Sequence, residues 1–88
     1  MTGYAFQPKK QNSVIVDILL QLGAVVYVKT NVPQSMMKPD TQNFTFGQTR
    51  NPRSKYITAA GSSGGLGALI AFRGSLMGIG TDVGGSVR

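Results

Sequence analysis

The feature that most restricts the fold of this chain is the crowding of glycine into its last third. Nine of its twelve glycines lie in residues 59–88, whereas residues 1–58 contain only Gly3, Gly23 and Gly47. Glycine tolerates left-handed backbone and allows close approach of other groups, so the last third favours tight turns and close packing. We therefore expect two kinds of structure along one short chain.

The first half of the chain carries ordinary helix and strand patterns. Apolar residues at helical spacing predict a helix that begins near Asn12 or Ser13 and ends at Gly23. The uncharged, β-branched run of residues 24–28 predicts a strand buried on both faces of a sheet.

The second half alternates loop, helix and strand. Ser35 is expected to cap a short turn, and the polar residues 38–59 are expected to form a long loop. Residues 64–73 predict a second helix that Gly74 ends, and residues 75–80 predict a short buried strand. The order indicates an α/β chain, a fragment of a mixed β-sheet flanked by helices, because two strands with helices on one side do not close a core.

The residue types that are absent exclude several kinds of chemistry. The sequence contains no Cys, His or Glu, and its three carboxylates, Asp17, Asp40 and Asp82, are far apart in the chain. This composition argues against disulfides, a metal site and a paired-carboxylate mechanism, and no cofactor is expected. Hydroxyls, lysines and backbone amides remain for catalysis.

The formal net charge of +6 raises the question of nucleic acid, but the cations are scattered and lack interleaved aromatic residues. We do not expect nucleic-acid binding, although a small basic binding module stays an alternative. The longest apolar stretch is interrupted by Arg73, and the first residues lack the apolar part of a signal peptide. These features, with the absence of Cys, favour an intracellular location and leave membrane association open.

Two segments rich in glycine and serine are candidates for chemistry, residues 60–65 and residues 81–88. Backbone amides that converge beside a serine can hold an anion or stabilise an oxyanion, although many glycine-serine turns have no such role. If Ser86 is a nucleophile, a neutral lysine or a relayed hydroxyl must accept its proton, because the chain has no His or Glu.

These residues resemble a known family. The stretch Gly-Ser-Ser-Gly-Gly-x-Gly-Ala-Leu-Ile, followed by Gly-Ser-Leu-Met-Gly-Ile-Gly-Thr-Asp-Val-Gly-Gly-Ser-Val-Arg, is similar to the core of the amidase signature family. The segments Gly-Ala-Val-Val-Tyr-Val-Lys-Thr-Asn-Val-Pro-Gln-Ser-Met and Phe-Gly-Gln-Thr-Arg-Asn-Pro resemble its acetamidase and fatty-acid amide hydrolase branch. The resemblance makes the chain a partial amidase signature domain, with residues 1–11 a loose lead-in and residues 12–88 the matching core.

The resemblance implies hydrolysis of a small-molecule amide by a Ser–cis-Ser–Lys relay. Ser86 matches the nucleophile, and Ser62 matches the bridging serine, which follows a cis peptide bond in this family. Met36 matches a position whose carbonyl faces the substrate. The other implied residues are the oxyanion-hole amides of Val83, Gly84, Gly85 and Ser86, and the supporting residues Ser63, Asp82 and Arg88.

The sequence departs from the family pattern at three points. The family's catalytic lysine belongs to a segment before this chain begins, and Lys29 occupies a different place in the pattern. Leu66 replaces a small or polar residue, and Ala60 replaces a glycine. We therefore expect the isolated chain to hydrolyse amides poorly unless the rest of an enzyme or a second chain completes it. A non-catalytic truncated product is the alternative.

Overall fold

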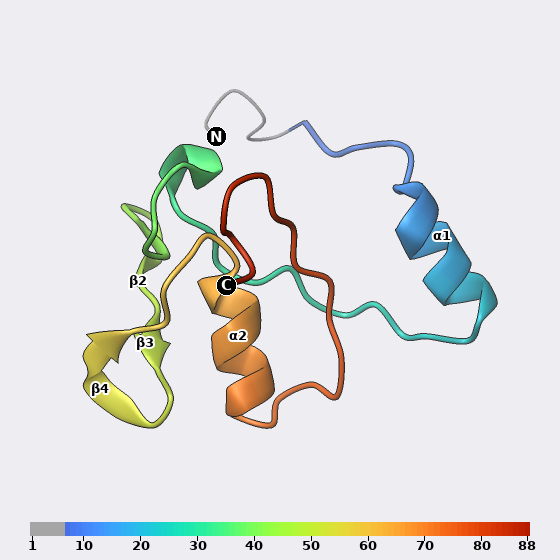
Figure 1. The fold of residues 1–88 in the computed structure, drawn as a ribbon. Coiled ribbons are helices and arrows are strands. Elements are labelled where there is room, and N and C mark those ends of the chain that lie inside the picture. Colours follow the sequence, from blue (N-terminus) through green and yellow to red (C-terminus); the bar gives the residue numbers. More distant parts are fainter. Residues whose placement is uncertain (1–6) are drawn as a thin grey trace.

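The computed structural model describes residues 7–88, so residues 1–6 of the expected lead-in lie outside the described part. Helix α2 lies beside a region of short strands, and α1 lies apart on the opposite side of α2 (Figure 1). The elements in chain order are α1 (Val14–Gln21), the 3₁₀ turn η2 (Gln34–Met36), β1 (Gln42–Asn43), β2 (Gly47–Gln48), β3 (Arg50–Asn51), β4 (Ser54–Thr58) and α2 (Gly64–Ala71).

The predicted first helix is confirmed as α1. Ser13 precedes it in extended conformation, and the Ser13 carbonyl accepts the amides of Val16 and Asp17 at 3.0 and 3.1 Å. Gly23 follows the last turn with φ +87°, a conformation that side chains disfavour. Glycine at this position therefore ends the helix as expected.

The predicted strand at residues 24–28 is wrong. This segment runs as a long extended trace from α1 toward the rest of the molecule, and no strand is formed in it (Figure 1). Val25 is 82% exposed, and Val26 and Val28 are also exposed. A strand needs a neighbour to share its backbone hydrogen bonds, and no other described segment pairs with this one.

The polar segment 38–59 is more regular than the predicted long loop. It folds into two small antiparallel ribbons, β1 with β2 and β3 with β4. Gln42 pairs with Gln48 in the first ribbon, and Arg50 pairs with Thr58 in the second. The expected turn is present as η2, but the predicted cap is wrong: Pro33 precedes the turn, Ser35 lies inside it, and the Ser35 hydroxyl donates to the Gln34 carbonyl at 2.6 Å.

The predicted second helix is confirmed as α2, and the Gly74 amide closes its last turn on the Leu69 carbonyl at 2.9 Å. The predicted strand at residues 75–80 is wrong, because this segment has no pairing partner among the described strands. The Tyr27 hydroxyl donates to the Gly74 carbonyl at 2.7 Å, which ties the segment 24–28 to the turn that ends α2.

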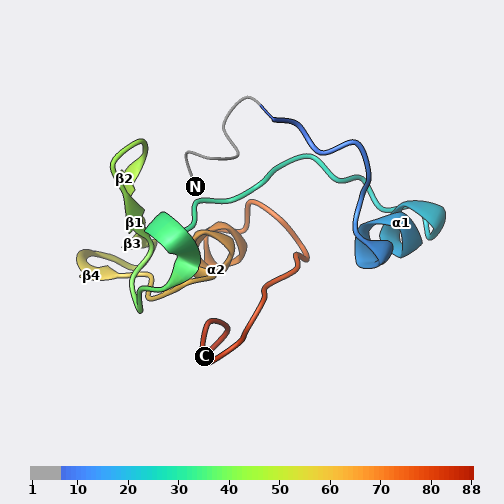
Figure 2. The same ribbon diagram turned by 90° about the horizontal axis from the view of Figure 1, so that it is seen from above.

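Among residues 7–88 there is no buried hydrophobic core, and Pro33 is the one apolar side chain that is fully buried. The accessible surface of 7345 Å² exceeds the roughly 5000 Å² expected of a folded monomer of this mass. Helix α1 lies apart from α2 in both views (Figures 1 and 2), with apolar residues such as Val14 and Leu22 uncovered. The fold class is α/β, without the mixed sheet that the sequence predicts.

Candidate functional site

A tight turn before α2 carries the first serine motif. The peptide bond between Gly61 and Ser62 is cis, and Ala60 has a left-handed φ of +57°. Ser62 is only 5% exposed, and Ser63 is the last residue before the helix. The chain thus turns sharply at the serine that the resemblance assigns to the bridging role.

A buried hydroxyl from the polar segment holds this turn. Thr41, which is fully buried, donates its hydroxyl to the Ala60 carbonyl at 2.8 Å. The same oxygen accepts the Gly64 amide at 3.0 Å. Thr41 therefore contacts the backbone on both sides of Ser62.

Two glycines allow the close packing of this turn. A Cβ at Gly61 would lie 3.0 Å from the backbone of Asp40. A Cβ at Gly65 would overlap the Asn31 carbonyl oxygen and lie 2.6 Å from its nitrogen. The serine turn and the first turn of α2 thus rest directly on the backbone of two earlier segments, with no space for a side chain between them.

The second serine motif is a loop organised by Asp82. Its carboxylate accepts the Gly85 amide on one oxygen and the Val87 amide, at 3.2 Å, on the other. Arg88 Nε lies 3.7 Å from the same carboxylate. The Gly85 amide, followed by that of Val87, lowers the pKa of Asp82. The loop therefore wraps around an ionised carboxylate.

One residue, Ser63, joins the two motifs. Its amide donates to the Ser86 carbonyl at 3.1 Å, and its hydroxyl donates to the Thr81 carbonyl at 3.3 Å. The loop that bears Ser86 is thereby fastened to the residue after Ser62.

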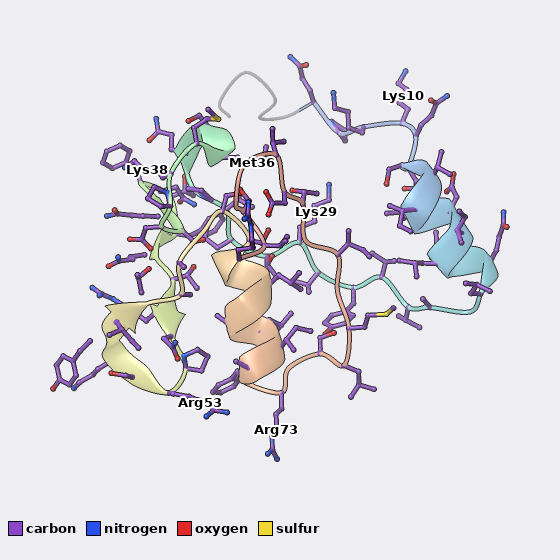
Figure 3. The ribbon with its side chains drawn as sticks, in the orientation of Figure 1. Lys10, Lys29, Met36, Lys38, Arg53 and Arg73 are labelled. Atoms are coloured by element: carbon purple, nitrogen blue, oxygen red, sulfur yellow. The ribbon has the colours of Figure 1, made fainter. Side chains whose placement is uncertain are left out.

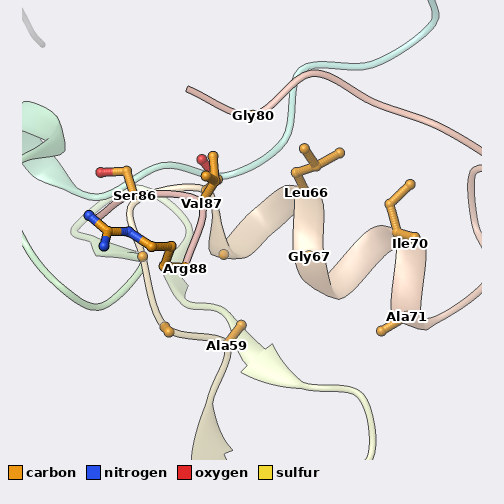
Figure 4. A pocket seen from close by; sticks show the side chains of 13 residues that line it. Ala59, Leu66, Gly67, Ile70, Ala71, Gly80, Ser86, Val87 and Arg88 are labelled. Carbon is orange, nitrogen blue, oxygen red and sulfur yellow. The ribbon is translucent and has the colours of Figure 1, made fainter. Parts of the chain in front are cut away.

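A cavity of about 650 Å³ lies at this junction (Figure 4). Ser86 and Arg88 lie at one end of it, and Ile70 and Ala71 of α2 lie at the other. Its wall is largely apolar, with Leu66 among the lining residues. A small apolar molecule with a reactive polar group could occupy such a space beside the Ser86 hydroxyl.

The structure brings together only part of the predicted site. Ser86, Ser63 and Arg88 line the cavity, and Ser62 lies buried one residue from its wall. The remaining predicted residues are not among those that line the cavity: Met36, Asp82, Val83, Gly84 and Gly85. Of the four amides predicted for the oxyanion hole, that of Gly85 donates to Asp82 instead.

Lys29 is not among the residues that line the Ser86 cavity. It lines a second cavity of about 590 Å³, together with Lys55 and Arg50, Leu69 of α2 and Phe72, which directly follows α2. Figure 3 shows the labelled cations spread over the molecule, with Lys10 before α1, Arg53 at the β3–β4 ribbon and Arg73 after α2. This spread agrees with the scattering of charge in the sequence.

Sequence reasoning missed the polar residues that hold the serine turn. Thr41 and Asp40 lie in the segment that was expected to be a loop, where nothing in the local pattern distinguishes a buried hydroxyl from an exposed one. Asp40 accepts hydrogen bonds from Thr58 and Gln48, and the Thr58 hydroxyl, as the strongest influence, lowers the Asp40 pKa. The sequence offers only one signal for these contacts, the adjacent polar residues Asp40 and Thr41.

Within residues 7–88 no group of three potential metal ligands occurs, and no helix is long and apolar enough to cross a membrane.

Several known proteins are similar to this chain over most of its length. The chain is 56% identical over 82 residues to "Vitamin D3 hydroxylase-associated protein" of Gallus gallus, which covers 93% of this chain and 18% of that protein. It is 53% identical over 81 residues to "Fatty-acid amide hydrolase 1" of Sus scrofa, and this match covers 92% of this chain and 14% of that protein. It is 51% identical over 77 residues to "Acetamidase" of Emericella nidulans, and this match covers 88% of this chain and 14% of that protein.

These matches confirm the predicted resemblance, and the chain spans less than a fifth of the length of these relatives. The model of the family described as "Amidase" matches residues 1–88. The chain therefore belongs to the amidase family.

Proposed function

We propose that this chain supplies the nucleophile and the bridging serine of an enzyme that hydrolyses small-molecule amides. The observation that carries the proposal is the hydrogen bond from the Ser63 amide to the Ser86 carbonyl, at 3.1 Å. It fastens the loop of one serine to the turn of the other, beside a cavity that the Ser86 residue lines.

In the proposed reaction, the Ser86 oxygen attacks the amide carbonyl carbon and passes its proton to the Ser62 hydroxyl. The Ser62 proton passes in turn to a neutral lysine. The relay then returns a proton to the nitrogen of the leaving amine as the carbon–nitrogen bond breaks, and an acyl ester of Ser86 remains. Water, deprotonated through the same relay, attacks the ester and releases the carboxylic acid.

Backbone amides of the loop 83–86 would stabilise the oxyanion formed by this attack. The Gly85 amide already donates to Asp82, so its first role is to shape the loop. The carboxylate of Asp82 also pairs with Arg88 at 3.7 Å, which keeps this negative charge partly balanced near the position of the oxyanion. We assign Asp82, Arg88 and Ser63 the task of holding the loop, and the Met36 carbonyl that of meeting the substrate.

The lysine of the relay is proposed to come from outside residues 7–88. No lysine is among the residues that line the Ser86 cavity, where Arg88 is the cation present. Arginine does not lose its proton in proteins, so it cannot accept one from a serine. Lys29 lines the other cavity, which argues against its use as the base.

The rest of an amidase, in the same chain or in a second one, is proposed to cover the apolar surface of this segment. The absence of a hydrophobic core in the described residues supports this, as does the small share of each relative that the chain spans. On this basis the isolated 88-residue chain is expected to show little turnover of amides.

A chimera tests the proposal. In it, this chain replaces the matching segment of the Emericella nidulans acetamidase, to which it is 51% identical. We expect the chimera to hydrolyse acetamide and to react with a fluorophosphonate probe at Ser86. Ser86→Ala should abolish both, and Ser62→Ala should lower turnover by at least about a hundredfold, the range typical of a general acid–base group.

Ser75→Ala is the matched control, because the Ser75 hydroxyl bonds only within its own turn, to the Met77 carbonyl at 2.7 Å. It should leave turnover unchanged. A folded chimera that reacts with the probe elsewhere than at Ser86, or not at all, would contradict the proposal. Robust amide turnover by the isolated chain would contradict the external lysine, and no turnover in any form would favour the non-catalytic alternative.

A further inference from the structure

We infer that Thr41 is a positioning residue for the bridging serine, an inference that rests on the proposed function. Its hydroxyl makes two hydrogen bonds, one to the Ala60 carbonyl at 2.8 Å and one from the Gly64 amide at 3.0 Å. These two backbone groups flank the three-residue turn that contains Ser62. The hydroxyl of Thr41 thus fixes both ends of the segment that carries the relay.

A hydroxyl is the side-chain group that this position requires. It must donate one hydrogen bond and accept another from a single oxygen, which Ser and Thr can do and Val and Ala cannot. Thr41 is fully buried, so water cannot replace either bond without a rearrangement. A Cβ at Gly64 would overlap the Thr41 oxygen, which shows how closely the two groups are packed.

Thr41 is itself held by the ribbons of the polar segment. Its carbonyl accepts the Thr49 amide at 2.9 Å, which ties it to the segment between β2 and β3. The preceding residue, Asp40, accepts hydrogen bonds from Gln48 of β2 and from Thr58 of β4. The polar segment therefore forms a frame behind the serine turn, and Thr41 is the point at which the frame contacts that turn.

If this role is correct, loss of the hydroxyl should act on the chemical step through Ser62. In the acetamidase chimera, Thr41→Val should lower kcat about tenfold, with KM changed less than about twofold. Thr41→Ser keeps the hydroxyl and should restore kcat to within about threefold of the parent. Thr45→Val is the control, since it removes a hydroxyl from an exposed position of the β1–β2 ribbon.

A double-mutant cycle separates positioning from a general structural role. In the Ser62→Ala background the bridging hydroxyl is absent, so Thr41→Val should lower the rate of fluorophosphonate labelling at Ser86 by less than about twofold. If Thr41→Val lowers the labelling rate equally in the parent and in the Ser62→Ala chimera, Thr41 stabilises the fold without acting through Ser62. That result would overturn the inference. So would a Thr41→Val chimera with the parent kcat.

The design distinguishes the two proposals. A folded parent chimera without labelling at Ser86 overturns the proposed function and this inference with it, whereas an active parent with unaffected Thr41 variants overturns the inference alone. If Thr41→Val lowers the folded fraction, measured by circular dichroism, the pair Thr41→Ala and Thr41→Ser replaces it. Both lack the threonine methyl group, so their ratio of kcat reports the hydroxyl; a ratio near one would overturn the inference.

Discussion

The amide of Ser63 lies 3.1 Å from the carbonyl oxygen of Ser86 and donates a hydrogen bond to it across twenty-three positions of the sequence. Ser63 also donates its hydroxyl to the Thr81 carbonyl. The two segments that the sequence marks as candidates for chemistry are therefore held together by one residue, which belongs to the first segment and contacts the second at two points.

The pH dependence of the loop 82–88 should follow Asp82. Amides that donate to its carboxylate, first that of Gly85, favour the charged form and lower its pKa. Because the folded-state pKa lies below the unfolded value of about 3.9, this contribution to stability is fully present above that value. It is lost as the pH falls through the folded-state pKa. An NMR titration of the Asp82 carboxyl carbon should give a midpoint below the usual aspartate range.

The variant Asp82→Asn provides the comparison for that titration. Its amide side chain keeps the size of the carboxylate and removes the charge, so the Gly85 amide resonance should become independent of pH in the acid range. A midpoint at the ordinary aspartate value in the parent chain would contradict the hydrogen bonds assigned to this loop.

A second titration concerns Asp40, in the frame behind the serine turn. The Thr58 hydroxyl is the main cause of its lowered pKa, and Gln48 contributes less. Thr58→Val should therefore raise the Asp40 pKa, and Gln48→Leu should raise it by a smaller amount. Thr45→Val should leave it unchanged. Carboxyl-carbon NMR measures all three, and an Asp40 pKa insensitive to Thr58→Val would refute the assignment.

Two glycines of α2 should respond in opposite directions to alanine. A Cβ at Gly65 would overlap the backbone of Asn31, so Gly65→Ala must push the helix and that segment apart. A Cβ at Gly67 meets nothing within 4 Å, and alanine there should stabilise the helix by about 0.5–1 kcal/mol. Hydrogen exchange of the α2 amides should accelerate in the first variant and slow in the second.

Gly67→Ala serves as the control for the same chemical change in the same helix. Equal exchange rates in the two variants would mean that Gly65 does not contact Asn31 closely.

Ala60 is the residue at which glycine should be an improvement. Its φ of +57° is unfavourable for a residue with a Cβ, at a cost of roughly 1–2 kcal/mol. Ala60→Gly removes that cost but makes the unfolded chain more flexible, which costs about 0.4–1 kcal/mol, so a net gain between about 0 and about 1.6 kcal/mol is expected. Ala59, next to it, lacks a positive φ, and Ala59→Gly should destabilise the turn. Amide exchange at residues 61–64 would report both, and protection lowered by Ala60→Gly would contradict the prediction.

Local sequence signals predicted the helices well. The spacing of apolar residues from Val14 and the position of Gly23 define α1, and the same kind of signal, ended near Gly74, defines α2. Both helices follow from interactions within about four residues, which a single sequence contains. The serine motifs were found for a similar reason, because their residues are contiguous.

The two strand predictions were wrong for a physical reason. Residues 24–28 and 75–80 have strand composition, but a strand exists only where a neighbouring segment shares its hydrogen bonds, and none of the described segments does. The ribbons of the polar segment were missed for the opposite reason. They are two-residue pairings without an apolar pattern, and they depend on side-chain contacts such as those of Asn43 with the Val32 carbonyl and with the amides of the next turn.

The sequence predicts candidate site residues only where they lie together in contiguous motifs. The resemblance proposes Ser86 and Ser62 for the relay, whereas the place of Thr41 at the serine turn depends on contacts nineteen and twenty-three positions apart. Such contacts between polar groups have no periodicity and no composition that a sequence displays.

The unpaired segment from Ala24 to Val28 also has a consequence for handling the protein. It is uncharged, rich in valine and free of proline, and the side chains of residues 25–28 are exposed to solvent. Such segments pair edge to edge between molecules and start aggregation. Lys29, directly after it, and the net charge of +6 oppose that association. Screening of these charges by salt should therefore reduce the solubility of the isolated chain.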